Sequence, residues 1–151
     1  MDVRKILWPT DFSKNASAAL PYVQSLGEKH QTEVHVLYVI DDLGHQEDPW
    51  YGELDKRHME QIHQWEEKKA KKRLDDICNS YLEGCPLFIK HVAIGDPAKK
   101  IIETAEKEGL DMIVMSSRGR RSFFGFGSVA EKVTKNTTVP VVTVPAELQE
   151  T

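Results

Sequence analysis

Apolar residues recur along this chain in short continuous runs, separated by longer stretches in which they stand three and four positions apart. The short runs cover 3–9, 34–40, 85–93, 112–115 and a last segment that begins at Val139 and ends at Val144. Runs of this length with little polar alternation are typical of parallel strands, which are covered on both faces. The stretches between them have the spacing of amphipathic helices. The pattern therefore predicts the element order β-α-β-α-β-α-β-α-β.

Two of the predicted helices have clear starts and ends. The helix after the first strand begins near Lys14, with Asp11 or Ser13 as its N-cap, and Pro21 inside it predicts a kink or a late start. The helix after the third strand has Asp96 as its N-cap, a proline at its first position and Gly109 beyond its end.

The longest predicted helix runs from Leu54 to about residue 82. Its broken apolar stripe consists of Ile62, Trp65, Leu74, Ile77 and Tyr81. A basic cluster at 68–73 is flanked by acidic residues at helical spacing, which favours a solvated helix face over a nucleic-acid patch.

Strict alternation of strands and helices predicts an α/β fold, a doubly wound five-stranded parallel sheet with right-handed crossovers. The 151 residues fit one domain, spanning 1–151, without linker or repeat. In such sheets ligands bind beyond the carboxyl ends of the strands, where the strand order reverses. The candidate site is therefore sought in the segments that follow the strands.

The segment after the fourth strand is the most informative of these. It is small and basic from Ser116 through Arg118 and Gly119, and Gly127-Ser128 opens a short helix. N–H groups at a helix start lack intrahelical partners, and the helix dipole adds about half a positive charge there. The segment thus predicts a cradle for phosphate, to which Arg118, Arg120 and Arg121 add positive charge.

Composition narrows the function classes. A formal net charge of −4 and a pI near 5.9 argue against a protein that coats nucleic acid. No run of eighteen apolar residues is present, so no membrane span is predicted, and the chain begins without the pattern of a signal peptide. A cytoplasmic location is expected.

Known catalytic motifs are missing. The turn after the first strand, Thr10-Asp11-Phe12-Ser13, lacks the glycines of a dinucleotide fingerprint, and the chain has no Walker phosphate loop and no G-x-S-x-G elbow. The histidines offer no catalytic or metal-binding pair: His58 and His63, five positions apart, splay around their helix and are expected in solvent. The chain is predicted to bind a ligand rather than to catalyse, with no metal held by protein side chains.

Several segments together resemble the universal stress protein family over essentially the whole chain. They are 6–13 (ILWPTDFS), Gly95-Asp96-Pro97, 111–120 (DMIVMSSRGR), 127–133 (GSVAEKV) and 140–144 (PVVTV). The resemblance implies a cytoplasmic, usually dimeric protein linked to stress survival. It also implies an adenine-nucleotide α-hydrolase-like fold with strand order 3-2-1-4-5.

The family's ATP-binding signature is G-x2-G-x9-G-[ST], and this chain departs from it twice. Ser116 stands at the first glycine, and seven residues instead of nine separate Gly119 from Gly127. A serine Cβ obstructs close approach of phosphate to the backbone, whereas its hydroxyl is able to donate a hydrogen bond. Both readings stay open.

The resemblance implies site residues by position. Pro9, Thr10 and Asp11 match the turn that contacts adenosine, and Val39 and Ile40 match the strand end that touches adenine. The residues that match the phosphate cradle are Gly119, Gly127, Ser128 and Val129. The implied ligand is ATP or AMP, with Mg²⁺ a common companion of such phosphates.

Three functions remain. The first is a stress-response protein that binds an adenine nucleotide with little or no hydrolysis. The second is a nucleotide-free homodimeric interaction module. The third is a slow ATPase or autophosphorylating enzyme, with Ser116, Ser117, Ser122 or Ser128 as acceptor. In the first two, the edge strand from Val139 to Val144 is expected to pair with a second copy of the chain. Phe123, Phe124 and Phe126 are expected to pack on the core or the dimer seam.

Overall fold

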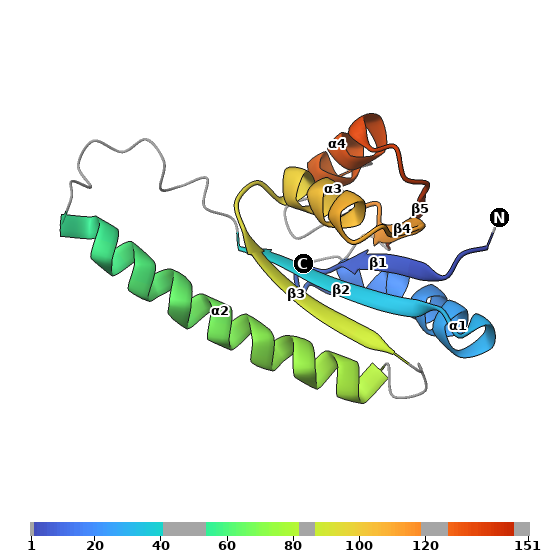
Figure 1. The fold of residues 1–151 in the computed structure, drawn as a ribbon, viewed down its shortest axis with the longest axis horizontal. Coiled ribbons are helices and arrows are strands. Elements are labelled where there is room, and N and C mark those ends of the chain that lie inside the picture. The colour runs from blue at the N-terminus through green and yellow to red at the C-terminus, as the bar shows by residue number, and fades with distance from the viewer. Residues whose placement is uncertain (1, 41–53, 82–86, 119–126, 147–151) are drawn as a thin grey trace.

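The computed structural model describes residues 2–40, 54–81, 87–118 and 127–146 (Figure 1). The elements in chain order are β1 (Lys5–Pro9), the 3₁₀ helix η1 (Ala16–Ala19), α1 (Leu20–His30), β2 (Glu33–Ile40), α2 (Leu54–Tyr81), β3 (Phe88–Ile94), α3 (Pro97–Lys107), β4 (Met112–Ser116), α4 (Ser128–Asn136) and β5 (Val141–Val144).

The five strands form one parallel sheet in the order β3-β2-β1-β4-β5, which confirms the predicted doubly wound topology. The chain winds from β1 outward to β3, crosses back, and continues through β4 to β5. The strand order therefore reverses between β1 and β4. At the amino ends of these two strands, the Asp111 carboxylate accepts the N–H groups of Arg4 and Lys5, each at 2.9 Å.

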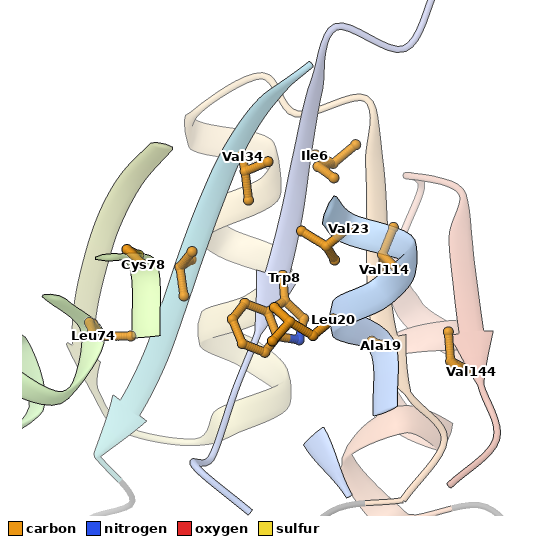
Figure 2. Packing of buried hydrophobic residues seen from close by; sticks show 11 residues of the cluster. Ile6, Trp8, Ala19, Leu20, Val23, Val34, Leu74, Cys78, Val114 and Val144 are labelled. Carbon is orange, nitrogen blue, oxygen red and sulfur yellow. The ribbon is translucent and has the colours of Figure 1, made fainter. Parts of the chain in front are cut away.

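Helices cover both faces of the sheet, with α1 and α2 on one side and α3 and α4 on the other (Figure 1). Successive strand residues point to opposite faces, so each strand contributes to two apolar clusters. The cluster on the α1 and α2 side includes Trp8, Leu20 and Leu74, which Figure 2 labels. The second cluster, toward α3 and α4, consists of Leu7, Leu37, Ala98, Ile101, Ala105, Leu110, Ile113, Met115, Ala130 and Val133.

The signals at helix ends were predicted correctly. Pro21 lies in the first turn of α1, which starts late, after the 3₁₀ turn. The Asp96 side chain accepts the Lys99 N–H at 3.1 Å and caps α3. Gly109, at φ 62°, reverses the chain after that helix, and the Leu110 N–H returns to the Ala105 carbonyl at 2.9 Å.

The apolar stripe predicted for α2 is wrong in its first half. Ile62 is 45% exposed and Trp65 is 62% exposed, whereas Ala70, Leu74 and Cys78 are buried. The reason is that α2 is longer than the strand it covers. A helix of 28 residues spans about 42 Å, whereas β3, with 7 residues, spans about 23 Å. The first part of α2 therefore projects beyond the sheet (Figure 1).

Three strands begin later than the apolar runs that predicted them. β1 starts at Lys5 instead of residue 3, β3 at Phe88 instead of residue 85, and β5 at Val141 instead of Val139. In the last case Pro140 has no N–H to donate, and its carbonyl accepts the Ile113 N–H at 2.9 Å before the strand begins. Residues just before β1 and β3 likewise accept a bond from β2: the Arg4 carbonyl from Glu33 N–H at 2.8 Å and the Leu87 carbonyl from Val34 N–H at 3.0 Å.

Candidate functional site

The described residues among the predicted site residues lie at the carboxyl ends of three neighbouring strands or in the segments that follow these strands. Pro9 ends β1, Ile40 ends β2 and Ser116 ends β4, and β1 pairs with both of the others. Hydrogen bonds from Thr10 N–H to the Leu37 carbonyl and from Ser117 N–H to the Val144 carbonyl, both 2.9 Å, continue the ladders past the strand ends. Because all strands are parallel, the segments that follow them leave from the same end of the sheet, where the carboxyl ends of the strands lie.

The turn after β1 is tied by its own polar side chains. The Thr10 hydroxyl accepts the Phe12 N–H at 3.1 Å, and the Asp11 carboxylate accepts the Ser13 N–H at 2.9 Å. The Ser13 hydroxyl in turn accepts the Ala16 N–H at 3.1 Å, at the start of the 3₁₀ helix. Of the two predicted caps, Ser13 serves this helix, whereas Asp11 stabilises the turn itself.

The two residues at the end of β2 point to opposite faces of the sheet. Val39 packs beside the cluster under α3 and α4, and Ile40 is 3% exposed. The Ile40 carbonyl accepts the Gly95 N–H at 2.9 Å, which brings the start of α3 to the same edge. The Val39 side chain therefore lies on the face covered by α3 and α4, and the Ile40 side chain lies on the opposite face of the sheet.

At the end of β4, Ser116 is 6% exposed and its hydroxyl accepts the Arg118 N–H at 3.2 Å. Gly127 N–H donates to the Ser117 carbonyl at 2.6 Å and so holds the start of α4 against the end of β4. Ser128, exposed, and Val129, half-buried, are the first residues of α4, whose leading N–H groups have no partner within the helix. The start of α4 is thereby fixed next to β4.

Arg118 is bound to the chain beyond β5, since its Nη1 donates to the Ala146 carbonyl at 3.1 Å. The remaining residues predicted for the cradle, Gly119, Arg120 and Arg121, lie outside the described residues, as do Ser122 and the phenylalanines at 123, 124 and 126. The described part of the predicted cradle thus consists of residues 116–118 and the start of α4.

Metal sites, membrane-spanning helices and cavities would each bear on function in the described ranges. There, no three His, Cys, Asp or Glu side chains are arranged to hold a metal ion. No described helix is long and apolar enough to cross a bilayer. A hollow of about 440 Å³ lies at the opposite end of the strands, where β1 and β2 begin. It is lined by Asp2, Val3, Arg4, Leu26, His30 and Thr32.

A partly buried histidine pair was missed from the sequence. His35, on β2 and 2% exposed, donates from Nε2 to the Glu33 carboxylate at 2.6 Å, which leaves its Nδ1 to accept from His91 Nε2 at 2.8 Å. The two rings are nearly parallel, 5.1 Å between centroids. The partners are 56 positions apart in the chain, so no local spacing reveals them.

This pair gives the fold a dependence on pH. Burial lowers the pKa of His91 from 6.5 and the neighbouring His35 lowers it further, whereas Glu108 raises it and Lys107, the smallest of these influences, lowers it. The unfolded chain therefore takes up a proton at His91 before the folded protein does, so the stabilising contribution is present above pH 6.5 and is lost as pH falls through the lower folded value.

Thermal unfolding followed from pH 7 to pH 5 is expected to show a falling Tm, and His91→Gln is expected to flatten this fall, because glutamine still donates to His35 but does not titrate. His58→Gln, at an exposed position, is the matched control and should keep the wild-type profile. An unchanged slope in His91→Gln would assign the pH dependence to other groups.

Comparison with known proteins adds to this geometry. Residues 2–145 match the model of the Universal stress protein family. Universal stress protein MJ0577 of Methanocaldococcus jannaschii is 32% identical over an alignment of 162 positions, which covers 93% of this chain and 94% of the relative.

The solved structure of MJ0577 superposes with a TM-score of 0.84 at 28% identity and covers 99% of this chain and 100% of that one. The structure of a universal stress protein from Archaeoglobus fulgidus in complex with dAMP has a TM-score of 0.66 at 20% identity, covering 95% of this chain and 99% of that one. At 20% identity, the similarity to the Archaeoglobus fulgidus protein shows a shared fold.

Proposed function

Because this chain belongs to the universal stress protein family, we propose that it is a cytoplasmic stress-response protein that binds an adenine nucleotide at the carboxyl ends of β1 and β4. One observation carries the proposal. The turn after β1 and the start of α4 leave the sheet from neighbouring strands at the point where the strand order reverses. This is where open parallel sheets bind ligands.

The adenosine half of the ligand is assigned to the turn after β1 and the end of β2. Thr10 accepts the Phe12 N–H, so the proton of its own hydroxyl remains to donate. A carboxylate accepts several hydrogen bonds, so the bond from Ser13 N–H leaves Asp11 able to accept from a ribose hydroxyl. The base is assigned to Pro9, Val39 and Ile40 at the ends of β1 and β2, with the Val39 side chain on the face covered by α3 and α4. A relative of the same fold was solved with dAMP.

The phosphate half is assigned to Ser116 and the start of α4. Gly127 N–H is occupied by the Ser117 carbonyl, so Gly127 holds the helix in place, and the N–H groups of Ser128 and Val129 face the phosphates. The predicted cradle also includes Arg118 and, outside the described residues, Gly119, and Mg²⁺ would accompany the phosphates. Hydrolysis is slow or absent, because Asp11 is assigned to a ribose hydroxyl and therefore lies away from the phosphates, where the attacking water would need a base.

Calorimetry with ATP and Mg²⁺ tests this function. We expect saturable heat with a dissociation constant below the millimolar range, and ATP or AMP in mass spectra of the protein as purified. No heat at millimolar ATP would favour the nucleotide-free dimerisation module instead. A phosphoserine at Ser116, Ser117, Ser122 or Ser128 would favour autophosphorylation.

The same titration decides what Ser116 does. Its hydroxyl accepts from Arg118 N–H and keeps its proton for the ligand, so Ser116→Ala is expected to weaken ATP binding roughly 2- to 12-fold, the worth of one hydrogen bond. Ser25→Ala, on the exposed side of α1, is the control and should bind like wild type. If Ser116→Ala binds normally and Ser116→Gly binds more tightly, the serine obstructs the phosphate.

The protein is further proposed to act as a homodimer. β5 lies at an edge of the sheet, and Val142 on it is 39% exposed. An apolar edge strand with open backbone groups favours pairing with another strand, and a second copy of β5 across a twofold axis supplies one.

A further inference from the structure

Phe12 adopts a backbone conformation that side chains of its size avoid. Its φ is 65°, in the left-handed region, where an L-residue brings its Cβ against the following carbonyl. Among the described residues other than glycine, only Gln31 shares this sign of φ, and it ends α1 as a left-handed cap. Phe12 instead sits within the turn that carries Thr10 and Asp11. Something other than local preference must hold it there.

Two side chains from other elements contact the Phe12 ring. Tyr38 of β2 packs against it with 4.4 Å between ring centroids and 33° between ring planes. The guanidinium of Arg73, on α2, lies 4.3 Å from the centroid of the same ring. Phe12 and Tyr38 also pack against the core cluster under α1 and α2. The ring is therefore held by a strand, a helix and the core.

The contacts with Tyr38 and Arg73 restrain the Phe12 side chain, whereas the hydrogen bonds of the turn restrain only the backbone. The bonds to Thr10 and Asp11 fix the N–H groups of Phe12 and Ser13, and any residue other than proline at position 12 is able to make them. The ring, in contrast, keeps its place on Tyr38 and Arg73 only while the backbone stays left-handed. Loss of the stack would free the turn to relax to an ordinary conformation.

Arg73 differs in this from its basic neighbours on α2. Lys71 pairs with Glu67 at 3.4 Å, and the Lys69 ammonium lies 4.6 Å from the Trp65 ring, so both contacts stay within the helix. Arg73 reaches the turn after β1. A planar guanidinium stacks on an aromatic face more closely than an ammonium does. The basic cluster was predicted as a solvated face, and one of its members has this second role.

We propose that Tyr38 and Arg73 are positioning residues for nucleotide binding: they lock Phe12 in its left-handed conformation and thereby set Thr10 and Asp11 for the adenosine. The proposal rests on the function proposed above and adds α2, which touches no proposed ligand atom, to the groups that determine affinity.

A double-mutant cycle tests this with ATP and Mg²⁺ in the calorimeter. Arg73→Met is expected to weaken binding about twofold to fivefold, the range of a partly exposed cation–π contact. Phe12→Gly removes the ring but accepts the positive φ without strain, and in that background Arg73→Met is expected to have no further effect. Arg73→Lys should restore part of the affinity.

Lys72→Met is the matched control, because it removes the same charge from the neighbouring exposed position of the same helix. Binding equal to wild type in Lys72→Met, with weaker binding in Arg73→Met, supports the role. Equal losses in the two variants would mean that only the net charge matters and would overturn it.

A readout without nucleotide separates this proposal from the function on which it rests. Amide hydrogen exchange at Phe12 and Ser13 is expected to accelerate several-fold in Arg73→Met and to stay at the wild-type rate in Lys72→Met. Faster exchange with unchanged ATP affinity would overturn the positioning role while the function stands. Absence of ATP binding by the wild type would overturn the function and this role together, whatever the exchange data show about the stack.

Discussion

Trp8→Ala is expected to lower the free energy of unfolding by about 3–5 kcal/mol, the range for truncating a large aromatic side chain in a packed core. Trp8 is 0% exposed, and Figure 2 shows its ring in the middle of the cluster between β1, α1 and α2. Its Nε1–H also donates to the Ala16 carbonyl at 3.3 Å, so the truncation leaves a cavity and a buried carbonyl without its partner. Urea unfolding followed by circular dichroism measures the change.

Trp65→Ala is the matched control, because the same atoms are removed from a side chain that is 62% exposed. Its effect is expected to stay within about 0.5 kcal/mol, as for most surface substitutions. Trp8→Phe retains a ring in the cavity and should fall between the two variants. If Trp8→Ala and Trp65→Ala cost the same, the cluster around Trp8 does not carry the stability assigned to it.

Val142→Lys is expected to convert the proposed homodimer to a monomer. Val142 lies on the edge strand β5, and a lysine there would place a charge without a partner in the apolar seam between two copies. A loss of about 100-fold or more in dimer affinity follows from a cost of roughly 3 kcal/mol. Light scattering coupled to size-exclusion chromatography, over a series of micromolar concentrations, reports the mass directly.

Leu87→Lys provides the comparison at the opposite edge of the sheet. Leu87 is 49% exposed, immediately before β3, and the same new charge there should leave the dimer intact. A wild-type protein that is monomeric at micromolar concentration would contradict the dimer itself. Dissociation by both variants would show that the seam does not lie on β5.

The parts of the fold that the sequence predicted are those with local causes. The apolar runs that became β1, β2 and β4 are buried on both faces, so their composition alone indicates parallel strands. Asp96 and Gly109 were assigned correctly because a helix cap depends on residues within one turn of it. The same holds for Gly127, which caps α4 as predicted.

The features that were missed depend on distances between elements. The spacing of Ile62 and Trp65 indicates an apolar face, but how far the neighbouring strand extends under that face is not encoded in the helix. The contact between His35 and His91 depends on the pairing register of β2 and β3. The conformation of Phe12 depends on Tyr38 and Arg73, far away in the sequence.

For the candidate site, the predicted element order already placed its segments together at the carboxyl ends of neighbouring strands. Thr10, Asp11 and Ser116 lie where parallel strands end, and this follows from the element order alone. What each group bonds to was not predictable. Arg118, expected to add charge for phosphate, donates to Ala146 at the far end of the chain, and the Ser116 hydroxyl is used within its own turn. Such contacts form only when the whole sheet is assembled.

The hydrogen bonds from the Arg4 and Lys5 N–H groups to the Asp111 carboxylate have a consequence for folding during synthesis. β1 leaves the ribosome before the other four strands of this sheet, yet one of its two neighbours is β4, and the hydrogen bonds that join their starts link residues 106 and 107 positions apart. Contacts this distant form late in folding, because a long loop must close first. The nascent chain therefore carries the middle strand with one side open until most of its length has been synthesised.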